Sequence, residues 1–230
     1  MYEDSSLLLT GGTGTFSKAF IKELLKTNIK KIKVYSRCEF KQAQMKSQFN
    51  DARLRYYIGD VRDESRLMRA MENVDYVIHT AALKRIEACE ADPLEAVKTN
   101  INGAVNVINC ALNHKVKKVV ALSTDKACCP TTLYGATKLV SDKLFVDANI
   151  YSTGNPIFSV VRYGNVFGSR GSIVPKIIEM LENNKIINIT DTNMTRFSID
   201  MKDAIKMVDI ALKTSKGGEI YVPKINSYEI

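Results

Sequence analysis

A tyrosine and a lysine in the middle of the chain have the residue types and the spacing that acid–base chemistry needs. Tyr134 and Lys138 are four residues apart within a predicted helix over residues 134–151, so both side chains lie on one face of that helix. The pKa of an unperturbed tyrosine is about 10, and a nearby cation lowers it toward neutrality. The pair is therefore a candidate general base with its activating cation.

A carboxyl group and an ammonium group stand side by side shortly before this tyrosine. Asp125 and Lys126 follow a predicted strand over residues 118–122, and the carboxyl end of a strand faces the ligand crevice of a parallel sheet. Neighbouring groups of opposite charge can divide the roles of acid and base. A structural ion pair is the alternative, and the presence of Tyr134 favours the catalytic interpretation.

The elements that must position these groups alternate between strand and helix. Hydrophobic periodicity predicts strands over residues 6–10, 31–35, 55–58, 75–79, 118–122 and 158–163. It predicts helices over residues 18–27, 64–71, 93–112 and 134–151. Such alternation is typical of right-handed crossovers, and so of an α/β fold with a doubly wound parallel sheet, a Rossmann domain.

The pattern loosens after residue 164. It predicts a helix over residues 174–181, a short apolar run over 187–189, a helix over 201–212 and a strand over 219–222. We therefore expect a nucleotide-binding domain over residues 1–165. Residues 166–230 are expected to form a smaller, partial substrate-binding region interleaved with the same sheet.

A glycine-rich turn joins the first predicted strand to the first helix. Gly11, Gly12 and Gly14 lie in this turn, where glycine permits positive φ and a close approach of the backbone to a pyrophosphate. The N-terminus of the following helix supplies N–H groups and the positive end of a dipole. The position of the turn in a strand–turn–helix unit favours dinucleotide binding over a merely tight turn.

The end of the second strand distinguishes NAD from NADP, since a carboxylate there binds the ribose 2′-hydroxyl and an arginine accommodates a 2′-phosphate. Ser36 and Arg37 stand at this position, Lys41 follows one helical turn later, and the first carboxylate is Glu39. This pattern predicts NADP, the alternative being that the two cations are simply solvated. Asp60, after the third strand, is expected at the adenine edge.

Composition excludes several other classes of protein. The 230 residues are 45% hydrophobic and 25% charged, which is ordinary for a globular chain, and no apolar run approaches the length of a membrane span. Five cysteines without a C-x-x-C pair predict reduced thiols in the cytoplasm and no metal site. The net charge of +8 comes from scattered lysines, which argues against a nucleic-acid partner.

Eleven sequence stretches resemble the extended short-chain dehydrogenases/reductases, and within them the inverting UDP-N-acetylglucosamine 4,6-dehydratases of pseudaminic acid and capsule polysaccharide biosynthesis. The stretches are residues 10–16, 35–37 with 41–42, 59–63, 79 with 81–84, 98–100, 122–127, 134–139, 141–145, 162–166 with 168–172, 194–197 and 217–225. In that resemblance the Thr-Asp-Lys triplet ending at Lys126 separates these dehydratases from 4-epimerases, which lack the Asp-Lys pair, and from retaining dehydratases, which carry Asp-Glu.

The resemblance implies three sets of site residues. The catalytic set is Asp125, Lys126, Tyr134 and Lys138. The NADP-binding set is Gly11, Thr13, Gly14, Thr15, Phe16, Ser36, Arg37, Lys41, Asp60, Val61, Thr80, Ser123, Tyr134 and Lys138. The set that meets the UDP-sugar is Lys84, Asn165 and Arg196.

The resemblance also implies a lyase that works by internal redox, and a homo-oligomer. A hydride leaves C4 of the sugar, water is lost across C5 and C6, and the hydride returns to C6 with inversion at C5. Two other interpretations stay open. One is a dinucleotide-binding homologue without turnover, and the other is a UDP-sugar 4-epimerase.

The sequence departs from the family pattern at a few positions. Ser17 stands where relatives have a glycine, Cys38 where they have an aspartate, and Thr80 where they have an alanine. The Cys128-Cys129 pair stands where relatives have small or amide residues, and Ser198 where they have a tryptophan. Relatives also continue beyond the segment over residues 222–225. We therefore expect this chain to lack a C-terminal segment that helps to close the sugar-nucleotide pocket.

Overall fold

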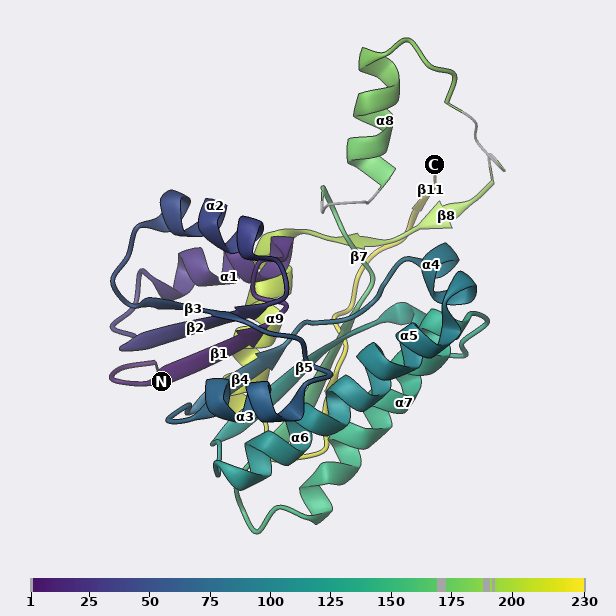
Figure 1. The fold of residues 1–230 in the computed structure, drawn as a ribbon. Coiled ribbons are helices and arrows are strands. Elements are labelled where there is room, and N and C mark those ends of the chain that lie inside the picture. Colours follow the sequence, from purple (N-terminus) through teal and green to yellow (C-terminus); the bar gives the residue numbers. More distant parts are fainter. Residues whose placement is uncertain (1, 169–172, 188–190, 192, 230) are drawn as a thin grey trace.

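The core of the fold is a seven-stranded sheet in which every pairing is parallel (Figure 1). It is seen in a computed structural model that describes residues 2–168, 173–187, 191 and 193–229. The strand order is β3-β2-β1-β4-β5-β6-β10. The strands are β1 (Ser6–Thr10), β2 (Lys31–Ser36), β3 (Leu54–Ile58), β4 (Tyr76–His79), β5 (Lys118–Thr124), β6 (Ile157–Tyr163) and β10 (Ile220–Tyr221).

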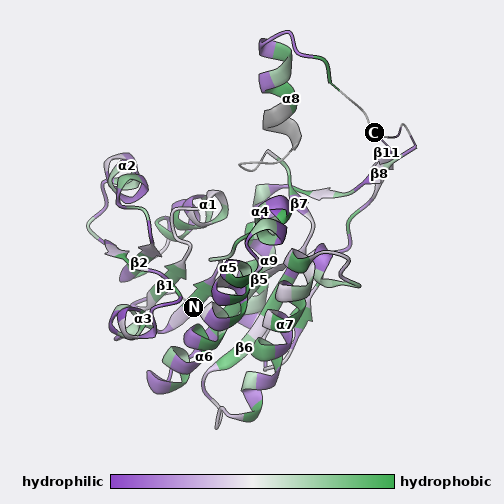
Figure 2. Ribbon diagram, turned by 45° about the vertical axis from the view of Figure 1, so that its right-hand side comes forward, coloured by the Kyte–Doolittle hydropathy of each residue, from purple (hydrophilic) through white to green (hydrophobic). Residues whose placement is uncertain are grey.

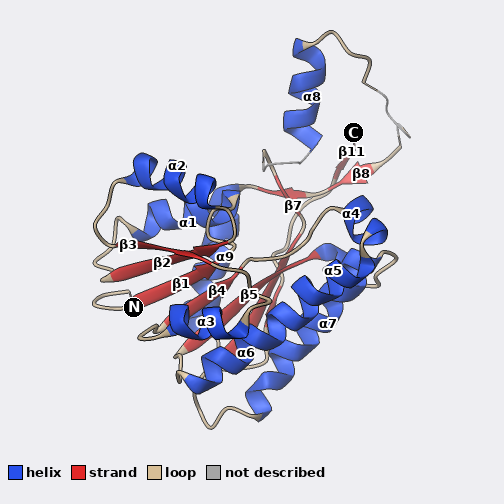
Figure 3. Cartoon of the chain, viewed as in Figure 1, coloured by secondary structure: helices blue, strands red, loops and turns tan. Residues whose placement is uncertain are grey.

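Helices cover both faces of this sheet (Figure 3). α1 (Thr15–Leu24) and α9 (Met201–Thr214) pack on one face, where α2 (Glu39–Phe49) adds Met45 to the same apolar cluster. α3 (Glu64–Met71), α6 (Gly103–Asn113) and α7 (Leu133–Asp147) pack on the other face. These helices mix hydrophobic and hydrophilic residues along their length, as expected of elements with one face on the core (Figure 2). The expected doubly wound α/β fold is confirmed.

Further elements connect the strands and helices of this core. They are α4 (Ile86–Ala91), α5 (Pro93–Val97), a π-helical segment (Lys98–Asn102), two 3₁₀ turns (Asp125–Ala127 and Ala148–Ile150) and α8 (Ile173–Glu182). β7 (Asn165–Val166) pairs with β9 (Ser198–Ile199), and β8 (Thr195–Arg196) pairs with β11 (Tyr228–Glu229). α8 lies away from the central sheet (Figures 1 and 3).

The predicted strands are all found with shifts of one or two residues, but the predicted helices needed correction. The helix expected over residues 93–112 is interrupted by the π-helical segment, which turns the Asn100 side chain inward to the Leu83 backbone. α2 was not predicted, because Gln42 and Met45 are its buried residues and its sequence therefore shows no helical spacing of apolar residues. The short helix α4 was also missed. Residues 188–189 of the predicted apolar run and residues 169–172 of one sequence stretch lie outside the described residues.

The last third of the chain returns to the sheet. β10 extends the sheet beside β6, and α9 packs against α1 on the sheet face.

A buried polar contact joins β1 and β4 in the core, where Thr10 Oγ1 and His79 Nδ1 are 2.8 Å apart. Burial, helped by the positive charge of Lys138, lowers the pKa of His79 to about 3.

Acid should therefore destabilise the fold through His79. The unfolded chain takes up a proton on this side chain below a pH of about 6.5, whereas the folded chain does not until the pH reaches about 3. The free energy of unfolding should thus fall by up to about 1.4 kcal/mol for each pH unit in this window. Urea denaturation at several pH values measures this slope.

His79→Asn should show a shallower slope, and His114→Asn, which alters the chain's other histidine, should keep the slope of the unaltered protein. Equal slopes in the two variants would contradict the assignment of acid sensitivity to His79.

Candidate active site

The turn between β1 and α1 is built for a close approach of the backbone to its surroundings. Gly11 has φ of +63°, and a Cβ there would lie 2.6 Å from Thr80 Oγ1. A Cβ on Gly12 would lie 2.7 Å from Val34 Cγ1. Gly14 caps α1 without a side-chain hydrogen bond, and the first turn of α1 carries no acidic residue. The N–H groups of Thr15 and its neighbours thus meet no carboxylate or capping side chain, an arrangement that suits a pyrophosphate.

Two departures from the family pattern contact each other beneath this turn. The hydroxyls of Ser17 and Thr80 are 3.2 Å apart, Ser17 Oγ lies 3.2 Å from the Gly11 carbonyl oxygen, and Thr80 Oγ1 donates to the Thr10 carbonyl oxygen at 2.7 Å. Ser17 is fully buried. The serine that replaces a glycine therefore finds its partner in the threonine that replaces an alanine, and the turn keeps its shape.

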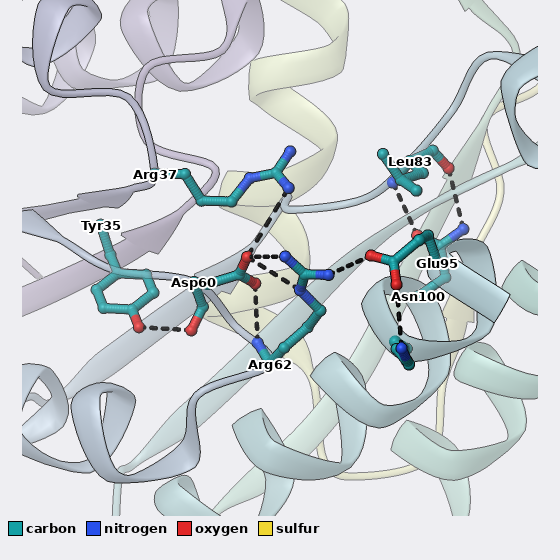
Figure 4. A network of polar contacts seen from close by, with 8 residues as sticks. Tyr35, Arg37, Asp60, Arg62, Leu83, Glu95 and Asn100 are labelled. Carbon is teal, nitrogen blue, oxygen red and sulfur yellow. Dashed lines mark hydrogen bonds and ion pairs between the residues drawn. The ribbon is translucent and has the colours of Figure 1, made fainter. Parts of the chain in front are cut away.

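A cluster of charges lies at the ends of β2 and β3 (Figure 4). Asp60 Oδ2 accepts hydrogen bonds from Arg62 Nε at 3.0 Å and Nη2 at 2.6 Å, and Arg37 Nη1 lies 3.8 Å away. Burial alone would raise the pKa of Asp60, but the hydrogen bonds and charge of Arg62, with Arg37, hold that pKa below its usual value. Asp60 is thus an anion already paired with Arg62, while the Arg37 side chain is 58% exposed and open to a further anion.

The neighbouring residues of this cluster fix its backbone. The amide of Gln42 donates to Ser36 Oγ at 2.9 Å and to the carbonyl oxygens of Ser36 and Tyr57, so the predicted Ser36 site is held in place by α2. Lys41 lies in the first turn of the same helix and is half-buried. Val61 is buried and packs against the start of α6. A Cβ on Gly103, the first residue of that helix, would lie 2.8 Å from Val61 Cγ2.

The end of β5 brings the predicted acid and base into contact. Thr124 Oγ1 donates to Asp125 Oδ1 at 2.8 Å, and Lys126 Nζ donates to the same oxygen at 3.2 Å. Both charged side chains are about one-third exposed. The Asp125–Lys126 pair is therefore formed within one 3₁₀ turn and keeps access to a ligand.

Tyr134 lies in the first turn of α7. Burial raises the pKa of Tyr134 to about 12, the nearby Thr124 hydroxyl lowers it, and the charge of Asp125 raises it. The phenol is thus protonated near neutral pH, and it needs added positive charge to act as a base. Thr124, which sequence reasoning did not assign a role, bonds to Asp125 and also affects the pKa of Tyr134.

Lys138 lies one helical turn beyond Tyr134 and is 3% exposed. Its Nζ donates to the Leu122 carbonyl oxygen at 2.9 Å. Burial lowers its pKa, and the charge of Asp142 opposes that shift. Asp142 is itself buried and accepts hydrogen bonds from Ser123 Oγ at 2.8 Å and Arg162 Nε at 2.7 Å. The Ser123 hydroxyl, which we expected to contact the cofactor, thus donates a hydrogen bond to Asp142.

Sequence reasoning also gave no role to Asp142, Arg162 and Asn100. The position of Asp142, four residues after Lys138 on the same helix, was a usable signal. Asn100 Nδ2 donates to Thr137 Oγ1 at 3.0 Å and to the Leu83 carbonyl oxygen at 2.9 Å. Asn100 thereby ties the loop that carries Lys84 to α7 (Figure 4 shows its Leu83 contacts). π-helical segments of this kind are frequent at functional sites.

The other two predicted substrate residues lie on the small sheets. Asn165 is in β7, and Arg196 is in β8, where it pairs in register with Tyr228 of β11. Both are exposed. No hydrogen bond seen between described side chains joins either residue to Asp125, Lys126 or Tyr134. A cavity of about 790 Å³ between α1 and α9 is lined by none of the predicted site residues.

Within residues 2–168, 173–187, 191 and 193–229, no helix has the length and apolar character needed to cross a membrane. The same residues contain no cluster of three or more histidine, cysteine, aspartate or glutamate side chains suited to a metal ion.

The sequence matches known proteins over its whole length. It is 53% identical over 234 residues to the "UDP-N-acetylglucosamine 4,6-dehydratase (inverting)" of Campylobacter jejuni, an alignment that covers 100% of this chain and 70% of the relative. It is 43% identical over 229 residues to the "UDP-glucose 4-epimerase" of Rickettsia prowazekii, covering 97% of this chain and 67% of the relative.

The fold matches equally well. The crystal structure of Pen from Bacillus thuringiensis superposes with a TM-score of 0.96 at 41% identity, covering 99% of this chain and 73% of that one. A family profile described as "Polysaccharide biosynthesis protein" matches residues 7–230. The resemblance expected from the sequence stretches is thereby confirmed, and the chain belongs to this polysaccharide biosynthesis family, within the extended short-chain dehydrogenases/reductases.

Proposed function

We propose that this chain is an NADP-dependent inverting 4,6-dehydratase that acts on UDP-N-acetylglucosamine. The observation that carries the proposal is the Asp125–Lys126 contact that follows β5, near enough to Tyr134 for the charge of Asp125 to act on the pKa of that tyrosine. The 53% identity to a relative of that name supports the same conclusion. The product is a 4-keto-6-deoxy sugar nucleotide with inverted configuration at C5.

The glycine turn and the first turn of α1 would hold the pyrophosphate of the cofactor, since that helix end has no capping side chain and no acidic residue. Ser36, Arg37 and Lys41 would hold the 2′-phosphate, where Arg37 is exposed and cationic. When bound, the nicotinamide supplies the acceptor and later the donor of the hydride. In this proposal Tyr134 and Lys138 adjoin it.

Tyr134 takes the proton of the C4 hydroxyl as that carbon is oxidised. The phenol has a pKa of about 12 in the free chain, so this role requires a cation nearby. Lys138 is placed to supply it from the same helix face, held by the Leu122 carbonyl oxygen and the field of Asp142. A C4 ketone then acidifies the proton on C5.

Asp125 and Lys126 carry out the elimination. One proton passed from Lys126 Nζ to Asp125 across their 3.2 Å contact converts the ion pair into an amine and a carboxylic acid. The amine takes the C5 proton, the acid gives its proton to the leaving hydroxyl at C6, and water departs. Both groups then have their starting charges again, with Lys126 holding the proton from C5.

UDP-sugar 4-epimerisation is the second candidate, because the Rickettsia prowazekii relative bears that name. An epimerase needs oxidation and reduction at C4 only, which Tyr134 and Lys138 could support. It gives no task to the Asp125–Lys126 pair, although the charge of Asp125 acts on the same tyrosine. The geometry therefore favours the dehydratase.

Incubation of the purified chain with UDP-N-acetylglucosamine tests the proposal directly. Proton NMR should show loss of the C6 hydroxymethyl signal and appearance of a methyl doublet beside a C4 ketone or its hydrate. Heat-denatured chain is the control. Formation of UDP-N-acetylgalactosamine instead would establish the epimerase.

Asp125→Asn should separate the two halves of the reaction. Oxidation at C4 needs only Tyr134 and Lys138, whereas loss of water needs an acid at the C6 oxygen. We expect the near-ultraviolet absorbance of the reduced nicotinamide to build up while dehydration slows by about 10²–10⁴-fold. Asp147→Asn, at the exposed end of α7, is the matched control and should turn over normally. Normal turnover by Asp125→Asn would mean that another group is the acid.

Arg37→Ala tests the choice of cofactor. Loss of a charge-assisted hydrogen bond to the 2′-phosphate should weaken NADP binding by about 1.5–3 kcal/mol and leave NAD binding unchanged. Calorimetric titration measures both affinities. Arg55→Ala is the control, because the Arg55 side chain bonds to the Ala52 and Leu54 carbonyl oxygens near the start of β3. A preference of the unaltered chain for NAD would overturn the NADP assignment.

A further inference from the structure

Two adjacent cysteines lie between the two halves of the catalytic set. Cys128 and Cys129 are both exposed and both free thiols. They follow the 3₁₀ turn that carries Asp125 and Lys126, and they precede α7, which begins at Leu133. The proposed reaction gives these thiols no role, and in the resemblance to the family their positions hold small or amide residues.

The segment that carries the thiol pair contacts the elements that carry the catalytic groups on both sides. The backbone N–H of Cys128 donates to the Asp125 carbonyl oxygen at 2.9 Å and so closes the turn that carries the acid and the base. On the other side, a Cβ on Gly135 would clash with the Lys126 carbonyl oxygen and lie 3.0 Å from Pro130 Cβ. The loop is thus pressed against the first turn of α7, beside Tyr134.

The backbone at the pair is already in an unfavourable conformation. Cys129 has φ of +48°, in the left-handed region that residues with a Cβ seldom occupy. The peptide bond between the two cysteines is trans, so their Cα atoms are about 3.8 Å apart. The peptide linkage fixes this separation below the roughly 4.4–6.8 Å that a disulfide usually spans. A disulfide between the two sulfurs therefore closes a small ring through the peptide bond, and closing this ring requires the φ and ψ angles of the loop to change.

We propose that Cys128 and Cys129 form a redox site at the edge of the active site, which a small-molecule disulfide of the glutathione type oxidises to an intrachain disulfide. One cysteine thiolate attacks the small disulfide, forming a mixed disulfide and releasing one thiolate. The second cysteine thiolate attacks the mixed disulfide, joining the two sulfurs and releasing a second thiolate. Two protein thiols are oxidised, one small disulfide is reduced, and the two protons pass to the released thiolates.

Oxidation at this site has a consequence for catalysis, a point that rests on the proposed function. The backbone shift needed for ring closure pulls on the Cys128–Asp125 hydrogen bond and on the contact with Gly135. It therefore displaces the Asp125–Lys126 pair relative to Tyr134. A strained disulfide also has an oxidising potential, so a reduced thiol pool reverses it readily. Oxidation at this site therefore lowers the turnover rate reversibly.

The other cysteines provide internal comparisons. Cys89 and Cys110 are buried, and burial raises the pKa of each thiol, to about 12 for Cys110. Little reactive thiolate forms at these positions near neutral pH. Cys38 is half-buried at the start of α2 and has no neighbouring cysteine in the sequence. A mixed disulfide that forms at Cys38 has no adjacent thiol to resolve it.

The test treats the full chain with oxidised glutathione at graded ratios to its reduced form, blocks the remaining thiols by alkylation, and digests with trypsin. Cleavage after Lys126 and Lys138 gives one peptide with both cysteines. We expect this peptide to lose both free thiols and to carry no glutathione before Cys38 is modified. Cys128→Ser and Cys129→Ser should each stop at a stable mixed disulfide on the remaining thiol.

Oxidation of Cys38 before this pair, or glutathione retained on both Cys128 and Cys129, would overturn the proposal. The peptide map needs no substrate, so it is decisive even if the dehydratase assignment fails. Where the chain turns over UDP-N-acetylglucosamine, oxidised glutathione should suppress turnover and dithiothreitol should restore it. The Cys128→Ser/Cys129→Ser double variant should be insensitive to both, and an equally inhibited double variant would contradict the link between the site and catalysis.

Discussion

The hydrogen bond from Lys138 Nζ to the Leu122 carbonyl oxygen holds the active-site side of the fold together. An ammonium group with 3% exposure is costly unless it is hydrogen-bonded and faces a negative charge. Leu122 provides the first and Asp142 the second, and Asp142 is fixed in turn by Ser123 and Arg162. Because these partners come from β5 and β6, α7 must lie against the carboxyl ends of those strands.

This placement of α7 explains why two kinds of chemistry share one site. Tyr134 lies in the first turn of the helix, and the Asp125–Lys126 pair lies in the 3₁₀ turn that follows the neighbouring strand. Thr124 bonds to Asp125, and both residues affect the pKa of Tyr134, so the groups for oxidation at C4 and for elimination across C5 and C6 lie around one turn. A single sugar can then undergo both steps without leaving the site.

Residue type and spacing were enough to predict the glycine turn and the Asp125–Lys126 contact, because each depends on positions near one another in sequence. The lowered pKa expected for Tyr134 beside Lys138 is not found, because burial raises the pKa of Tyr134 to about 12. The doubly wound sheet followed from the alternation of apolar strands and helices. α2 could not be predicted from periodicity, since its buried residues are one glutamine and one methionine. The Ser17–Thr80 contact and the Asp142–Arg162 contact join residues far apart in sequence, and the π-helical turn at Asn100 depends on its bonds to Leu83.

The central claim is that the hydrogen removed from C4 returns to C6 of the same sugar. UDP-N-acetylglucosamine carrying deuterium at C4 tests this most directly, with the position of the label in the product read by NMR and mass spectrometry. The account predicts a product methyl group that contains the deuterium at C6 and a C4 ketone without it. Deuterium that stays at C4 in an epimerised sugar, or that is lost to solvent, would contradict it.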